Sequence, residues 1–219
     1  ATLARAGTVF PDTVITSFPT DGYHRTTTEW NKKANSSETN AGWIQTYQFS
    51  SRLTLNQSFL WTRYQYPIEK RNLPYNAWEF KGTDNHLFSL GIQYKLPWAY
   101  WVSELARSKS GGIGIINGWV GSFSKQWDWS LLVRNYQRNF HSFYGNPFKE
   151  SSRPINERGI YGGTRFTPSR KWQYSAYVDY FQFPYRRFQA DTSSYGFGTL
   201  VHIRWRPNRN FQATSMYQM

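Results

Sequence analysis

Alternation of apolar and polar residues is the sequence feature that most constrains how this chain can fold. Every second position from residue 172 to residue 180 is apolar or aromatic: Trp172, Tyr174, Ala176, Val178 and Tyr180. The same spacing returns at Phe197, Thr199, Val201, Ile203 and Trp205. Successive side chains of a β-strand point to opposite faces, whereas a helix would mix the two sets. The pattern therefore predicts strands with one aromatic face and one polar, basic face.

The connections between the predicted strands alternate in length. Short turns are predicted at residues 50–51, 96–97, 124–126, 167–170 and 207–208, and long polar connections at residues 65–85, 139–157 and 183–194. Consecutive antiparallel hairpins have this spacing, and outer-membrane barrels have short turns at one end and longer loops at the other. We therefore predict an all-β fold, an antiparallel up-and-down transmembrane β-barrel with about 10–12 strands.

Composition shows no break that would mark a linker, so one β-barrel region is predicted over residues 1–219. Residues 1–41 are its N-terminal strand and loop segment, with strands expected at residues 3–10 and 14–18. The capping box of Thr26 and Glu29 predicts a short helix over residues 30–34. Residues 42–219 are a meander of hairpins, whose first strand is expected at residues 43–49. The expected strand count is odd, whereas bacterial single-chain barrels have even counts, so at least one further strand is expected elsewhere.

The alternation alone does not say which face meets the core. Aromatic residues make up 20% of the chain, yet the mean hydropathy is −0.71. A soluble barrel with its apolar face inward would show the same period. Two points favour a membrane barrel: so many rings are difficult to pack inside a small cylinder, and rings near strand ends suit the interfacial girdles of membrane barrels. The residues predicted to face lipid are Trp127, Trp129, Trp172, Tyr174, Val178, Val201, Ile203 and Trp205.

The net charge limits the kinds of partner that this chain can bind, but it does not constrain the fold. A formal net charge of +13 and a pI near 10.0 predict attraction to polyanions such as nucleic acid, anionic lipid or phosphorylated glycolipid. The chain has no cysteine, so disulfides, thiolate metal sites and a cysteine nucleophile are excluded. No apolar run approaches the roughly 18 residues of a membrane-spanning helix.

Two groups of basic residues are candidate sites. On the polar strand face we place Arg134, Arg138, Arg165, Asp179, His202, Arg204 and Arg206. This group predicts either a basic lumen that passes an anion, or a plugged interior in which the arginines pair with Asp179, Glu104 and Asp128. In the external loops we place Lys149, Arg153, Arg158, Arg186 and Arg187. These predict contacts with the phosphates of lipopolysaccharide, which arginine binds through its planar fork, or simply a solvated basic rim.

Catalytic and metal chemistry find little support in the sequence. His141, Ser142, His202 and Asp179 invite comparison with a hydrolase, but no serine lies at a recognisable spacing from a histidine and an acid. Four scattered histidines without an acidic cluster predict no metal site, and no cofactor is expected. We therefore expect a protein that is not an enzyme.

Short motifs in a fixed order suggest a family. They are Ser17-Phe18, Gly22-Tyr-His-Arg-Thr26, Leu73-Pro-Tyr-Asn76, Phe80-Lys-Gly82, Arg134-Asn-Tyr136, Phe143-Tyr-Gly-Asn146, Asn156-Glu-Arg-Gly159, Tyr177-Val-Asp-Tyr-Phe181 and Phe183-Pro-Tyr-Arg-Arg187. Together they resemble the barrel region of Bacteroidota outer-membrane proteins that carry a helix-hairpin-helix domain. The resemblance implies an envelope location, further strands beyond this segment and, by analogy alone, a link to DNA uptake.

The leading hypothesis is a non-enzymatic outer-membrane barrel that serves as a pore or as the anchor of a cell-envelope complex. Its expected partners are membrane lipid, lipopolysaccharide and other envelope proteins, with DNA as a further candidate. The alternative is a soluble basic β-barrel that binds nucleic acid through interleaved arginines and rings.

Overall fold

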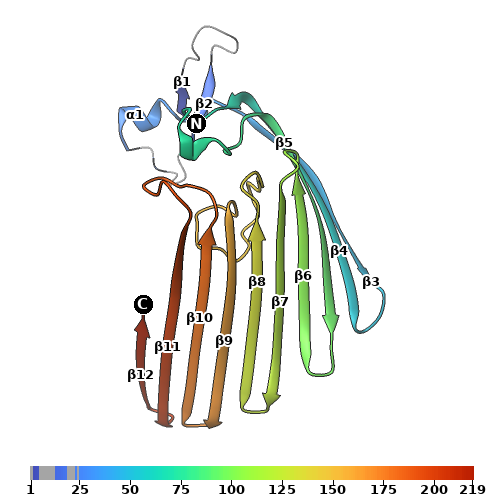
Figure 1. The fold of residues 1–219 in the computed structure, drawn as a ribbon, viewed down its shortest axis with the longest axis vertical. Helices are drawn as coiled ribbons and strands as arrows, with labels where there is room; N and C mark the ends of the chain where they lie inside the picture. The colour runs from blue at the N-terminus through green and yellow to red at the C-terminus, as the bar shows by residue number, and fades with distance from the viewer. Residues whose placement is uncertain (1, 5–12, 19–22, 24) are drawn as a thin grey trace.

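The computed structural model describes residues 2–4, 13–18, 23 and 25–219, and its strands stand side by side as one curved wall (Figure 1). In this part of the chain twelve strands join a single sheet, in the order β1-β2-β4-β5-β6-β7-β8-β9-β10-β11-β12, with β3 paired to β4. All pairings are antiparallel except one parallel bridge between Ile15 and Ile68. The predicted all-β, antiparallel, up-and-down fold of barrel type is confirmed, with the sheet open between β3 and β12.

The elements are β1 (Thr2–Ala4), β2 (Val14–Ser17), α1 (Thr27–Trp30), β3 (Glu38–Gln48), β4 (Leu53–Ile68), η1 (Pro74–Asn76), β5 (Gly82–Lys95), β6 (Ala99–Ser108), β7 (Ile113–Ser124), β8 (Trp127–Tyr136), β9 (Glu157–Ser169), β10 (Trp172–Phe183), β11 (Ser194–Asn208) and β12 (Phe211–Gln218). No helix in the described part of the chain is long and apolar enough to cross a membrane.

Turns and loops separate to the two ends of the wall (Figure 1). At the lower end in this view, which we call the turn end, at most four residues join each pair of strands. At the opposite, loop end lie the long connections 69–81, 137–156 and 184–193. Residues 109–112, between β6 and β7, make a short connection at the loop end, so the alternation of lengths is not strict.

Strand register places the apolar side chains on one face of the sheet. Across β8 to β11, Trp129 pairs with Thr164, Thr164 with Ala176, and Ala176 with Val201. Directly paired residues of antiparallel strands share a face. All eight residues predicted to face lipid lie on this side, the apolar face, and Val178 and Val201 are about half exposed. Arg134, Asp179 and Arg165 lie on the opposite, polar face.

Several predicted boundaries were wrong. β3 begins at Glu38, ahead of the expected residue 43, because its polar first residues pair with Trp61 to Tyr64 of β4. The helix begins after Thr26, whose Oγ accepts a hydrogen bond from Glu29 N (3.2 Å), but it ends at Trp30. At the N-terminus the structure has β1 and β2, and residues 5–10 of the expected first strand lie outside the described residues.

Two small clusters form the core, and both lie at the loop end. Ile15, Tyr64, Ile68 and Phe80 make one, and Ala106, Tyr136 and Phe140 the other. Each contains a residue of a loop packed on strand residues. The sheet is therefore covered at its loop end and bare at its turn end.

Candidate functional site

The polar face carries a buried ion network beneath the loop 137–156. Arg134 of β8 donates from Nε to Glu157 Oε1 (2.6 Å), and from its two terminal nitrogens to both oxygens of Asp179 (2.8 and 2.9 Å). The three side chains come from three neighbouring strands and are at most 2% exposed. All three guanidinium nitrogens thus have carboxylate partners, as a buried charge requires.

Glu157 joins this network to the loop. Besides Arg134, it accepts hydrogen bonds from Glu150 N (2.9 Å), Ser151 N (3.1 Å) and Ser151 Oγ (3.1 Å). Two carboxylates facing one arginine leave an excess negative charge, which these N–H and O–H donors stabilise. The loop is therefore part of the network and closes it from water.

Further contacts hold the loop against the polar face. Tyr136 Oη donates to Phe148 O (2.8 Å), and the guanidinium carbon of Arg134 lies 4.9 Å from the Phe148 ring centroid. Asn85 of β5 donates to His141 O (2.9 Å), and the Phe140 ring packs over Gly114 of β7. Loop 137–156 consequently covers this face from β5 to β10.

His141 lies within this covering loop. Its ring meets that of Phe80 edge to face, with the ring centroids 5.6 Å apart, and the residue is 7% exposed. Burial lowers the pKa of His141 to about 4, with Arg153 acting in the same direction and Glu79 against it. The imidazole is therefore neutral at neutral pH, which is the form that burial favours.

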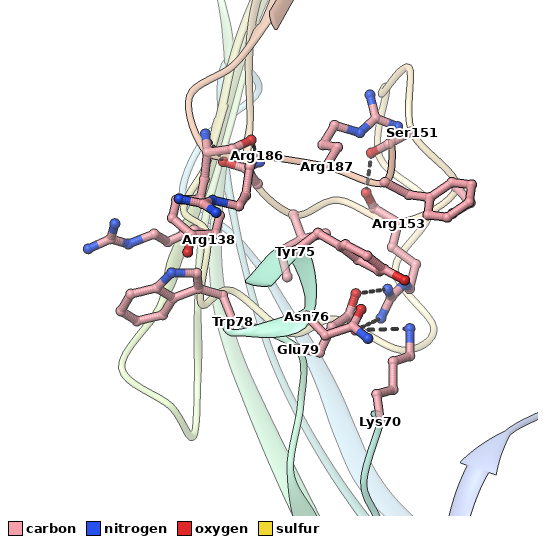
Figure 2. Close-up of a pocket in the computed structure, with 15 residues that line it drawn as sticks. Lys70, Tyr75, Asn76, Trp78, Glu79, Arg138, Ser151, Arg153, Arg186 and Arg187 are labelled. Atoms are coloured by element: carbon pink, nitrogen blue, oxygen red, sulfur yellow. Dashed lines mark hydrogen bonds and ion pairs between the residues drawn. The ribbon is translucent and has the colours of Figure 1, made fainter. Parts of the chain in front are cut away.

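A second site is a cleft of about 310 Å³ where the three long connections meet (Figure 2). We call it the three-loop cleft. Lys70, Tyr75, Trp78 and Glu79 line it from residues 69–81, Arg138 and Arg153 from residues 137–156, and Tyr185, Arg186, Arg187 and Phe188 from residues 184–193. Glu79 accepts hydrogen bonds from Arg153 (2.8 and 2.5 Å) and lies 3.2 Å from Lys70 Nζ. Burial would raise the pKa of Glu79, but these cations outweigh it and lower the pKa.

The structure brings together some residues predicted for the polar face and separates others. Arg134 and Asp179 form the buried network, while Arg165 pairs with Asp128 (2.5 Å) and Arg204 donates to Gln173, both nearer the turn end. His202 pairs in register with Ser175 on the same face. Arg138 does not join them, because β8 ends at Tyr136 and Arg138 stacks on Trp78 in the three-loop cleft.

The residues predicted for the external loops divide in the same way. Arg186 and Arg187 line the three-loop cleft, and Arg187 also lies 3.8 Å from the centroid of the Phe183 ring. Arg153 lines it too, but Glu79 neutralises it. Lys149 donates to Asn146 and lies outside the cleft. Arg158 lies in β9, opposite Asn135 and Gln182 on the apolar-face register.

Glu157 was absent from the predicted partners of Arg134, and Glu104, which was among them, forms no ion pair in the part of the chain that the structure describes. The signal for Glu157 was its spacing. Glu157, Gly159 and Tyr161 alternate onto the polar face once residue 157 is taken as the first residue of a strand.

Among the residues described, no group of three or more His, Asp or Glu side chains is placed to hold a metal ion.

Comparisons with known proteins give one structural likeness. No family model matches this chain, and no curated protein matches it. Among solved structures, a KdgM porin is similar with a TM-score of 0.34 and 10% sequence identity, over 84% of this chain and 88% of that chain. Membership of the helix-hairpin-helix family stays a prediction.

Proposed function

We propose that this chain is the wall of an outer-membrane β-barrel of pore type. The observation that carries the proposal is the separation of the two faces. Large apolar side chains such as Ile160, Val178 and Phe197 are more than half exposed on one side, while buried ions lie on the other. An exposed apolar face of this extent is costly in water and favourable in hydrocarbon. The polar face is then the lumen side.

An aromatic belt near the turn end supports this placement. Ring contacts between 5.4 and 6.5 Å run from Trp98 through Trp129, Phe123, Trp127, Phe166, Tyr174, Trp172 and Trp205 to Phe211. Beyond it the turns and the adjoining strand ends carry the exposed cations Arg52, Lys95, Lys125, Arg170, Lys171, Arg206 and Arg209. Rings followed by cations suit the boundary between hydrocarbon and lipid phosphates.

The covering loop suggests how such a pore is narrowed. Residues 137–156 occupy the polar face at the loop end, and the Arg134 network anchors them there. None of the described residues covers the turn end of the same face in this way, and Arg165 and Arg204 are exposed there. We propose a lumen that is constricted at its loop end and wider at its turn end.

A catalytic role is not part of the proposal. Asp179, the acid that a hydrolase would use to orient His202, already takes hydrogen bonds from two nitrogens of Arg134. Binding of nucleic acid by the sheet is less favoured, because the tryptophans of β8, β10 and β11 lie on the apolar face, whereas Arg134, Arg165 and Arg204 lie on the polar face. A role as anchor of an envelope complex, or in DNA uptake, rests on the motif resemblance alone.

Gel migration and conductance test the proposal together. Folded barrels resist dodecyl sulfate until they are boiled, so the chain refolded in detergent should migrate differently before and after heating. Reconstitution into planar lipid bilayers should then give discrete conductance steps. Identical migration, together with recovery from the soluble fraction of cells, would contradict a membrane barrel.

A further inference from the structure

The three-loop cleft is a built feature of the fold. Asn156, whose backbone has a positive φ of 55°, donates from Nδ2 to Tyr185 O (2.8 Å) and accepts from Tyr185 N (2.9 Å). This clamp ties the connection 184–193 to the covering loop. The Tyr185 ring meets Trp78 edge to face at 6.2 Å, which brings in the connection 69–81. These contacts therefore fix the walls of the three-loop cleft in the absence of a ligand.

Three guanidinium groups of the cleft have no carboxylate partner among the described residues: Arg138, Arg186 and Arg187. The other two cations of the cleft, Lys70 and Arg153, share Glu79. Five cations and one carboxylate therefore surround the cleft, and the excess positive charge belongs to the three unpaired arginines. A concave site with such an excess attracts anions.

Aromatic rings position two of these arginines. The guanidinium carbon of Arg138 lies 4.0 Å from the Trp78 centroid and 5.8 Å from that of Tyr185, and the guanidinium carbon of Arg186 lies 5.7 Å from the same Tyr185 ring. Figure 2 shows Arg138 and Arg186 one above the other on this side of the cleft. Stacking holds a guanidinium plane while its N–H edge remains able to donate.

The other side of the cleft is aromatic. Tyr75 and Phe188 meet edge to face at 5.5 Å, and both line the cavity. Such rings offer apolar faces to the flat side of a sugar ring, and a cavity of about 310 Å³ holds a group of that size.

We infer that the three-loop cleft binds a phosphate group carried on a sugar, with Arg138 and Arg186 donating to the phosphate oxygens and Tyr75 and Phe188 packing on the sugar. Arginine forks match phosphate geometry with paired hydrogen bonds. The inference rests on the proposed function only for the position of the cleft, at the rim of a barrel. There the sugar phosphate comes either from a soluble molecule or from a membrane glycolipid.

Calorimetric titration of the full chain, refolded in detergent, tests the site. Glucose 6-phosphate should bind at least tenfold more tightly than glucose. In the double variant Arg138→Gln, Arg186→Gln its affinity should fall at least tenfold. The control is Lys149→Gln, which removes one positive charge outside the cleft from the loop that carries Arg138, and the affinity of this variant for glucose 6-phosphate should stay within twofold.

Lipopolysaccharide with intact core phosphates and its dephosphorylated form distinguish the two sources. Competition by the phosphorylated form alone assigns the glycolipid, and binding of glucose 6-phosphate without such competition assigns a soluble ligand. The inference is wrong if the double variant binds like the unmodified chain, if Lys149→Gln loses as much affinity, or if no phosphorylated probe binds. Each variant must keep its heat-dependent gel shift, so a failure of this site is separate from a failure of the barrel.

Discussion

Two ion pairs on the same face of the sheet show what the covering loop does. At the loop end Arg134 and Asp179 are almost fully buried, whereas nearer the turn end the side chain of Arg165 is 59% exposed and that of Asp128 35%. Arg134 of β8 reaches past β9 to Asp179 of β10, Arg165 of β9 reaches Asp128 of the adjacent β8, and both make hydrogen bonds of normal length. Both are arginine–carboxylate pairs, although Arg134 also binds Glu157, and only Arg134 lies beneath the covering loop. We therefore expect the two pairs to contribute very differently to stability.

Arg134→Leu should have the largest effect. It leaves Asp179 and Glu157 buried without their cation, so we expect a loss of about 3–5 kcal/mol in the free energy of unfolding. Urea titration of the refolded chain in detergent measures it. A loss under about 1 kcal/mol would mean that water reaches this network and that the loop does not cover it.

Gly159→Ala should weaken the same ion network, because residue 159 lies directly beside the Arg134 guanidinium. A Cβ at residue 159 would lie 2.7 Å from both terminal nitrogens of Arg134, so the guanidinium must move, at a cost of about 1–3 kcal/mol. Gly162→Ala is the matched control in the same strand, because nothing lies within 4 Å of its Cβ. Equal urea midpoints for the two variants would contradict this packing.

Acidification should release the covering loop before it affects the turn end. The pKa of His141 in the folded chain, about 4, is below its usual 6.5, so the unfolded loop binds the proton more readily. The resulting stability is complete above pH 6.5 and is lost as the pH falls towards 4. Hydrogen exchange of residues 137–156 at pH 7 and pH 5 measures it. His141→Phe should remove the pH step, and His202→Gln, on the uncovered part of the face, should leave it.

Arg165→Gln should have the smallest effect. Water screens an exposed ion pair, so it contributes little to the free energy of unfolding, and the carboxylate of Asp128 keeps its hydrogen bond from Ser122 (2.6 Å). Urea titration beside Arg134→Leu makes the comparison direct. Losses of similar size would show that the loop does not distinguish the two ends.

Sequence reasoning reached the fold because strand period is local. The alternation around Val178 and Val201 can be recognised from residues that are close in the sequence. The same alternation also assigned Arg134 and Asp179 to one face. It failed where strands end. Arg138 was placed by extending the period of β8 beyond Tyr136, and the polar start of β3 at Glu38 looked like a loop.

Glu157 was missed for a different reason. Its partners in residues 150–151 are backbone and side-chain groups of a loop, and the path of that loop depends on packing of Phe140 and Phe148 against distant strands. The three-loop cleft likewise joins residues more than a hundred positions apart, such as Pro74 and Tyr185. Long-range contacts between loops do not produce a periodic pattern that could be recognised in a single sequence.

The sidedness of the sheet is the claim on which the rest depends, and a chain without cysteine allows it to be measured residue by residue. Single cysteines at Val178 and Val201, and at Ser175 and Arg204, would be reacted with a charged maleimide after reconstitution in lipid vesicles permeable to the reagent. We predict that the cysteines at 175 and 204 react and those at 178 and 201 do not. Rapid reaction at 178 and 201, with protection at 175 and 204, would contradict the account.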